Sequence, residues 1–196
     1  MHFKKVQILC FLLLSLSVKV QAAHFVGISY FAQNSLYKST SKDSGAGDLF
    51  GHTALFPFTY TYDTEFGYGW NFSPQLQWTL IPHDSSTYKS SMMLLNFPVG
   101  SVISNNWSWY AGPGLMYYTI KGSGGTKLLN NGTGTATFAV PDQTVTMKTI
   151  TTDLGMAFKS GGLRLAFGTL MDSFLSTTGK RNYNLYLNFS LGFGGY

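Results

Sequence analysis

Hydrophobic and polar residues alternate with a period of two along most of the chain after Ala23. Apolar or aromatic residues occupy every second position in six stretches, at 54–62, 93–99, 107–117, 154–158, 163–167 and 183–193. Strict alternation is typical of β-strands that bury one face and expose the other. Because no helical stripe interrupts this pattern, the sequence predicts an all-β protein.

The second face of these strands carries Gly, Ser, Asn and a few charged side chains. A soluble sandwich or lipocalin-like barrel needs an outer face rich in Lys and Glu. Here Asp, Glu, Lys and Arg make up 11% of the chain, against about 25% in ordinary soluble domains. Such a sparse polar face suits the inside of a narrow barrel whose apolar face meets lipid.

Aromatic residues on the apolar face recur at a spacing that fits a membrane. Ten residues of strand rise about 34 Å, which at a tilt of about 40° spans roughly 26 Å of the membrane normal. That span matches the apolar band of about 25 Å between two aromatic girdles. The predicted membrane-interface aromatics are three pairs ten residues apart, Tyr60 with Trp70, Trp107 with Tyr117 and Tyr183 with Phe193, together with Trp109.

Turns and loops divide the chain into eight strands. Short turns are predicted at 71–74, 104–106 and 160–162, and longer polar connections at 38–51, 82–89, 121–143 and 176–181. Short turns lie on the periplasmic side of outer-membrane barrels, so both chain ends are expected there. The sequence therefore predicts an eight-stranded antiparallel up-and-down transmembrane β-barrel.

The first 22 residues have the organisation of a cleavable signal peptide. Lys4 and Lys5 precede a short apolar run at 8–16, and small residues at Val20 and Ala22 have the spacing that signal peptidase reads. The run is about half the length of roughly 20 residues that a transmembrane helix needs. We therefore expect a signal peptide at 1–22 and a barrel domain at 23–196. The single cysteine, Cys10, falls in the removed segment, so the mature chain is expected to form no disulfide.

Charge and histidine content exclude several functions. Thirteen Lys and Arg against eight Asp and Glu give +5, and removal of Lys4, Lys5 and Lys19 leaves ten against eight, or +2. Because no basic run remains to follow phosphates, we expect no nucleic-acid binding. The histidines beyond the signal peptide, at 24, 52 and 83, lack the spacing of metal ligands, so no metal site or cofactor is expected.

Polar side chains on the predicted inner face form the candidate site. The interior of an eight-stranded barrel is just wide enough for side chains to fill it. We therefore expect an ion-pair and hydrogen-bond network that closes the lumen, with a narrow polar conduit as the alternative. An unpaired buried charge is costly, so Arg164 is expected to have a carboxylate partner. The predicted network consists of Asp63, Glu65, Gln77, Asp153, Lys159, Arg164 and Asp172.

The export signal, the eight alternating strands, the turn Trp-Asn-Phe-Ser-Pro at 70–74 and the run Trp-Ser-Trp-Tyr-Ala-Gly-Pro-Gly-Leu at 107–115 resemble the small outer-membrane β-barrel superfamily of Gram-negative bacteria. OmpA, OmpX and OmpW are members of it. The resemblance implies a location in the bacterial outer membrane, in contact with its lipid and lipopolysaccharide. It also implies a structural, surface-interaction or narrow-channel role without catalysis. The aromatic phase ends at Phe193, three residues before the chain end, which departs from the family pattern.

Two other functions remain open at this point. Barrel enzymes that modify lipid A or phospholipid are similar in size and use a His with a Ser and an acidic residue, for which His52 and the run 83–86 are candidates. A soluble exported lipocalin-like carrier of an apolar ligand would turn the aromatic face inward. For the barrel itself we expect a monomer with a possible surface ligand at the loops 38–51 and 121–143, where the glycine-rich runs 122–125 and 132–134 are predicted to be mobile tips.

Overall fold

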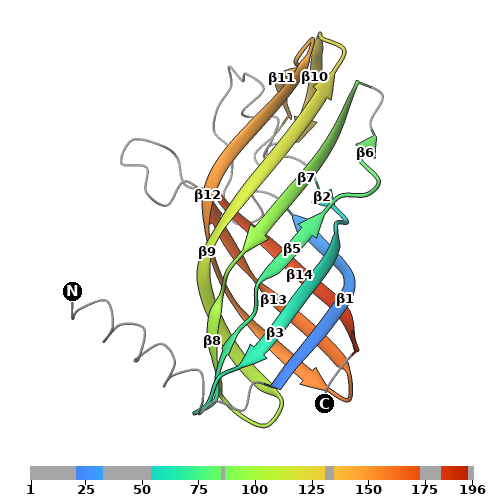
Figure 1. Cartoon of the computed structure of the whole chain (residues 1–196). Coiled ribbons are helices and arrows are strands. Elements are labelled where there is room, and N and C mark those ends of the chain that lie inside the picture. Colours follow the sequence, from blue (N-terminus) through green and yellow to red (C-terminus); the bar gives the residue numbers. More distant parts are fainter. Residues whose placement is uncertain (1–20, 33–53, 85–86, 131–134, 173–181, 194–196) are drawn as a thin grey trace, which may run out of the picture.

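The computed structural model describes residues 21–32, 54–84, 87–130, 135–172 and 182–193, which form an antiparallel sheet closed into a barrel (Figure 1). No helix among these residues is long and apolar enough to cross a membrane. The strands are β1 (Gln21–Ala32), β2 (Ala54–Leu55), β3 (Phe58–Glu65), β4 (Trp70–Phe72), β5 (Gln75–Trp78), β6 (His83–Asp84), β7 (Tyr88–Asn96), β8 (Val99–Val102), β9 (Trp107–Gly122), β10 (Thr126–Asn130), β11 (Thr135–Ala139), β12 (Thr144–Ser160), β13 (Leu163–Asp172) and β14 (Asn182–Phe193).

Three of the barrel strands are interrupted by a two-residue break that contains a proline. Pro57 separates β2 from β3, Pro74 separates β4 from β5, and Pro98 separates β7 from β8. Proline has no N–H to donate to the ladder, so the pairing lapses locally. The register is the same on both sides of each break. With each broken pair counted as one strand, the ring runs β1, β2/β3, β4/β5, β7/β8, β9, β12, β13, β14 and back to β1, which confirms the predicted eight strands.

The strands are steeply tilted, as their register shows. A path of directly paired residues followed once round the ring leaves β9 at Tyr117 and returns to it at Trp107, ten residues away. A shift of this size requires the strands to tilt against the barrel axis. The path runs through outward-facing apolar residues throughout: Tyr117, Met93, Trp78, Phe58, Ile28, Phe189, Leu165, Phe158 and Trp107.

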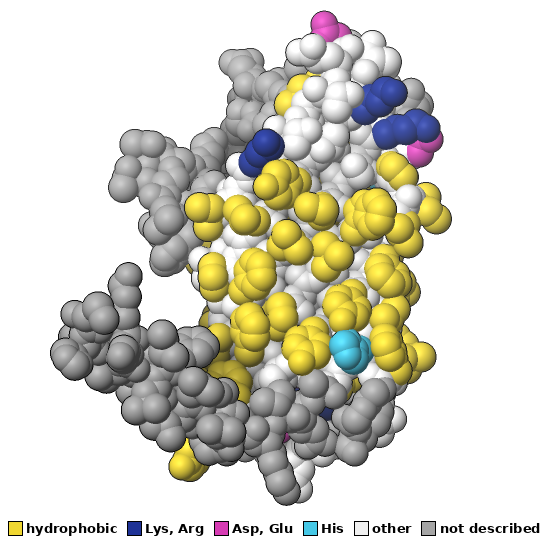
Figure 2. All heavy atoms as spheres, in the orientation of Figure 1, with side chains coloured by type: hydrophobic (Ala, Val, Ile, Leu, Met, Phe, Trp, Pro, Cys, Tyr) yellow, Lys and Arg dark blue, Asp and Glu magenta, His cyan; other side chains and the backbone are white. Residues whose placement is uncertain are grey.

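The outer surface carries a broad apolar belt. Figure 2 shows hydrophobic side chains in a band across the barrel wall, with Lys side chains beyond its loop-side edge. Leu187, in the middle of β14, is 52% exposed, and Leu191 of the same strand is 60% exposed. Soluble monomers rarely expose contiguous apolar patches beyond a few hundred Å². The outward direction of the apolar phase agrees with the sequence prediction.

The interior is polar near the short turns and apolar near the loops. The predicted inner face of Gly, Ser, Asn and scattered charge holds for the turn-side half, but it is wrong for the other half. There a buried apolar cluster fills the barrel, including Phe31, Leu55, Met92, Leu94, Met116, Tyr118, Ile120 and Leu170. In the sequence, the four consecutive apolar residues 92–95 indicate this apolar interior, because they place apolar side chains on both faces of β7.

The first short turn lies at 66–69 and not at 71–74 as predicted. Gly67, Tyr68 and Gly69 all have positive φ, and the Trp70 amide donates to the Gly67 carbonyl. The segment 71–74 instead continues a barrel strand, with Asn71 and Ser73 buried inside. The apolar alternation continues through 66–70, so the sequence pattern did not indicate a turn there. The turns at 104–106 and 160–162 are where the sequence predicts them.

The long connection at 121–143 is more regular than predicted. β9 and β12 extend past the barrel, and β10 pairs with β11 as a hairpin at their end (Figure 1). The glycine-rich run 132–134, predicted to be a mobile tip, lies outside the described residues. Thr alternates with apolar residues in β11, a composition that favours strand pairing. In the connection at 82–89, β6 and the start of β7 form a short ladder. The predicted loops at 38–51 and 176–181 lie outside the described residues.

Candidate functional site

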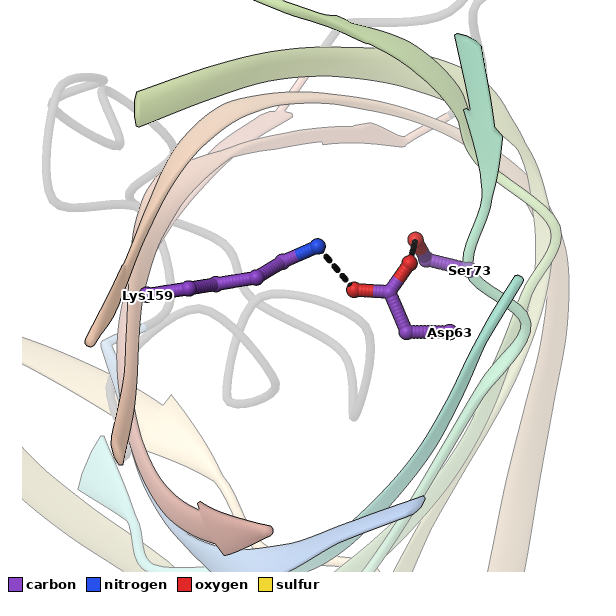
Figure 3. Close-up of polar contacts among 3 residues, drawn as sticks. All are labelled: Asp63, Ser73 and Lys159. Atoms are coloured by element: carbon purple, nitrogen blue, oxygen red, sulfur yellow. Dashed lines mark hydrogen bonds and ion pairs between the residues drawn. The ribbon is translucent and has the colours of Figure 1, made fainter. Parts of the chain in front are cut away.

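An ion pair crosses the barrel interior near the short turns. Lys159 of β12 and Asp63 of β3 reach toward each other from opposite walls, and the Ser73 hydroxyl donates to Asp63 Oδ1 at 3.0 Å (Figure 3). The Asp63 side chain is 6% exposed, whereas the Lys159 side chain is 33% exposed. The carboxylate is therefore neutralised inside the barrel, and the ammonium group remains close to water at the mouth.

A second network surrounds Asp153 in the middle of the barrel. Asn96 Nδ2 donates to Asp153 Oδ2 at 3.0 Å, and the Tyr186 hydroxyl donates to Oδ1 at 2.6 Å. The Tyr110 and Tyr186 hydroxyls lie 2.6 Å apart and share a hydrogen bond. These four residues come from β7, β9, β12 and β14. The network therefore links strands that are distant around the ring and fixes the shape of the interior.

Arg164 of β13 is 1% exposed and lacks the predicted carboxylate partner. Among the described side chains, no carboxylate oxygen lies within 4.0 Å of its guanidinium, and its Nε and Nη1 have no hydrogen-bond partner. The nearby acidic groups are already engaged, Asp63 by Lys159 and Asp153 by two hydrogen bonds. The guanidinium instead lies 5.9 Å from the centroid of the Tyr110 ring, a cation–π distance.

An amide layer completes the polar half. Gln77 is fully buried and its Nε2 donates to Gln75 Oε1 at 3.2 Å. Thr59, the register partner of Gln77 on β3, accepts a hydrogen bond from Asn188 Nδ2 at 2.8 Å. Gln77 is among the lumen residues predicted from the sequence, whereas Gln75 and Asn188 are not. Both share the inward phase of their strands, so applying that phase to uncharged amides would have found them.

Two predicted lumen residues are not placed with the others. Glu65 is exposed at the end of β3, opposite Asn71, because the chain turns immediately after it. Direct partners on antiparallel strands share one face, so Glu65 keeps the inward phase of the buried Asn71 but lies at the open end, outside the buried network. Asp172 is the last residue of β13, and its side chain lies outside the described part of the structure.

The predicted interface aromatics all point outward. Those near the short turns form ring contacts, with Trp70 and Trp109 centroids 6.0 Å apart and Trp107 and Phe158 centroids 5.2 Å apart. Phe193 stacks on His24 at 5.5 Å.

At the loop-side edge, the Lys148 ammonium lies 5.7 Å from the Tyr117 ring. Tyr183, on β14, is half-buried on the same outward face. The pairs 107/117 and 183/193 each lie on one strand. Tyr60 and Trp70 lie on different strands, because the turn at 66–69 separates them, so their spacing does not measure a membrane span. The Tyr60 hydroxyl lies 2.8 Å from His24 Nδ1.

The candidate catalytic residues of the sequence lie only in part within the described residues. His83 is exposed in β6, and its ring centroid lies 6.4 Å from that of Tyr88. His52 and the two serines at 85–86 lie outside the described residues. No group of three or more His, Cys, Asp or Glu in the described ranges could hold a metal ion.

Two glycines make room for the tyrosines of the Asp153 network. A Cβ built on Gly155 would lie 2.6 Å from Tyr110 Cζ and from the Phe167 carbonyl oxygen, and one on Gly168 would lie 2.6 Å from the Tyr186 hydroxyl. We expect Gly155→Val to displace Tyr110 and lower the free energy of unfolding by about 1–3 kcal/mol, as overpacking does. Urea unfolding of the purified barrel measures this. Met156→Val, on the neighbouring outward-facing position, is the control, and an equal loss there would contradict the packing argument.

No family model and no curated protein matches the sequence. The chain is similar to solved structures, among them the following three. Neisserial surface protein A is 11% identical with a TM-score of 0.40, covering 89% of this chain and 97% of that one. The Yersinia pestis outer membrane protein Ail in a phospholipid bilayer nanodisc is 11% identical with a TM-score of 0.45, covering 88% and 99%. Crystalline Ail, the attachment invasion locus protein of Yersinia pestis, in complex with the heparin analogue sucrose octasulfate, is 12% identical with a TM-score of 0.51, covering 89% and 99%. The chain therefore has the eight-stranded barrel fold of Ail.

Proposed function

We propose that the protein is an integral β-barrel of the bacterial outer membrane, exported with removal of residues 1–22, that presents its loop end at the cell surface. The apolar belt carries this proposal, since it surrounds a closed ring of paired strands, and such rings can span lipid because strand pairing satisfies backbone groups without water. A soluble carrier would leave the same belt in contact with water. Similarity to the fold of an outer-membrane protein supports the location.

Membrane insertion has a direct test. We expect the protein to be retained in isolated outer membranes and to migrate differently on a gel before and after boiling, because the closed barrel resists detergent until it is heated. Gel mobility of the membrane fraction, with and without boiling, measures this. Release as a soluble periplasmic species without a mobility shift would contradict the proposal and favour the carrier.

The lumen is proposed to be closed, which favours a structural or surface-interaction role over a channel. The polar half is crossed by the Lys159–Asp63 ion pair, and the loop-side half is filled by apolar side chains such as Leu94, Met116 and Leu170. An apolar constriction excludes water and ions. The proposed closure therefore rests on both halves of the interior, whereas the polar pattern of the sequence predicts closure by polar side chains alone.

Closure predicts that the purified protein gives no reproducible ion conductance in planar lipid bilayers. Ions entering from the turn side would meet the buried guanidinium of Arg164 and then the apolar cluster. The measurement compares the unmodified protein with Arg164→Ala. A stable conductance that this substitution changes would show an open polar conduit.

A surface-binding role is the second candidate. Lys121, Lys127 and Lys148 lie on the extended strands β9, β10 and β12, which reach past the apolar belt. Ail, which shares the fold, was crystallised with a sulfated sugar. We propose that the loop end at 121–143 meets a surface ligand, and that the protein acts as a monomer without catalysis. Binding of a sulfated oligosaccharide to the intact barrel, compared with its unsulfated form, tests this candidate.

A further inference from the structure

An apolar groove of about 480 Å³ opens on the outside of the barrel between β2/β3 and the segment that joins β5 to β6. Its walls include Ile28, Phe56, Phe58, Leu80 and Ile81, and His83 and Asp84 lie at one end. Phe56 is 67% and Ile81 86% exposed, so these side chains have no protein partner covering them among the described residues. The groove is continuous with the apolar belt on its loop-side half.

The groove exists because the barrel wall is unpaired at this level. The ladder between β3 and β5 ends at the pair Phe58–Trp78. No backbone hydrogen bond joins residues 54–57 to residues 79–82 in the described structure, and both segments contain a proline, Pro57 and Pro82. The Thr79 amide instead donates to the Met92 carbonyl of β7. Leu55, a member of the interior cluster, lines the gap between the two strands.

A basic hollow of about 390 Å³ adjoins the polar end of the groove. Asp84 lines both the groove and the hollow, and Lys89 and Lys121 line the hollow. The two lysines are direct register partners on β7 and β9, and like charges directly opposite each other are destabilising. Asp84 pairs with Lys89 at 2.8 Å, and Lys127 lies over the nearby Tyr88 ring at 4.8 Å. One carboxylate therefore accompanies the two ammonium groups that line the hollow, and the hollow has a net positive charge that an anion would neutralise.

We infer that the groove and the hollow together bind one phosphate-bearing lipid of the outer leaflet, with an acyl chain along Ile28, Phe56 and Ile81 and its phosphate between Lys89 and Lys121. The inference rests on the proposed membrane location. The apolar groove fits an acyl chain because it opens onto the lipid-facing belt. The lysines fit a phosphate because they lie beyond the belt edge, at the height of lipid headgroups, where basic side chains attract anionic lipid. The phosphate can belong to a phospholipid or to lipid A.

The test is native mass spectrometry of the intact purified barrel titrated with phosphatidylglycerol, phosphatidylcholine or lipid A. We expect phosphatidylglycerol or lipid A to bind in one-to-one ratio and in preference to zwitterionic phosphatidylcholine. Lys121→Gln should weaken that binding about fivefold, since one lysine near an anionic lipid contributes about 1 kcal/mol. Lys148→Gln, on β12 at the belt edge and outside the hollow, is its control. Ala54→Phe should fill the groove and displace the lipid, whereas Ala111→Phe on the outward face of β9 should not.

Equal binding of the anionic lipids and phosphatidylcholine, or equal effects of the paired variants, would overturn the inference. Preference between phosphatidylglycerol and lipid A identifies the source of the phosphate. The gel-mobility shift on boiling checks each variant for a folded barrel. If the unmodified protein shows no shift and no membrane retention, the proposed function fails; if it shows both and binds no anionic lipid, the lipid site alone fails.

Discussion

Leu187→Arg is expected to lower the free energy of unfolding of the membrane-inserted barrel by about 2–4 kcal/mol, the cost of an arginine at the bilayer midplane on a lipid-facing strand position. Leu187 lies halfway along β14, faces outward, and has Tyr30 and Phe167 as its direct neighbours in the ring. Neither neighbour is a carboxylate that could form an ion pair with the guanidinium. Urea titration of the barrel in lipid vesicles, with folding monitored by the gel-mobility shift, measures the change in the free energy of unfolding.

Gln143→Arg is the matched control, because it adds the same charge at an exposed position just before β12 and beyond the belt. Its cost should stay below about 1 kcal/mol, as for positions near the interface. The comparison distinguishes the two environments of the outer face. If the belt faced water, Leu187→Arg would be close to neutral, and an equal effect of the two substitutions would contradict the membrane placement.

The sequence was sufficient for the fold because alternation reports directly on which side chains face which environment. One strand position in two is apolar over most of β9 and β14, and these phases face outward in the structure. The register then follows, since a slip of one residue would turn the whole apolar face inward. The first turn escaped prediction because the apolar phase of β3 continues through Phe66, Tyr68 and Trp70 while the chain reverses.

The interior was predictable only in part. Asp63, Asp153 and Lys159 were recognised by their charge and phase, but their partners depend on contacts between strands far apart in the chain. Barrel geometry decides that Asp63 pairs with Lys159 and that Asp153 accepts from the Tyr186 hydroxyl. It also leaves Arg164 without a carboxylate among the described side chains, and composition does not encode this choice. The groove likewise forms where two proline-containing segments, 54–57 and 79–82, line it together without pairing. The sequence shows these segments only as isolated prolines.

The ion pair in the lumen predicts unequal effects of removing its two members. Lys159→Met removes the cation from a carboxylate that is 6% exposed and retains only the Ser73 hydroxyl as a partner. Breaking a buried pair by removing one partner costs about 3–5 kcal/mol, because an uncompensated charge stays buried. Asp63→Asn leaves Lys159, whose side chain is 33% exposed and can turn toward water at the mouth, so a loss of about 1 kcal/mol is expected.

The double variant, Lys159→Met with Asp63→Asn, decides whether the charge or the packing is responsible. It removes both charges and keeps side chains of similar volume, so it should be more stable than Lys159→Met alone, in the way that a buried pair can be replaced by neutral groups at little cost. Urea unfolding of all four proteins completes the cycle. If the two single variants lose equal stability and the losses add in the double variant, the ion pair contributes nothing of its own. The lumen would then be held by the Asp153 network and the apolar cluster.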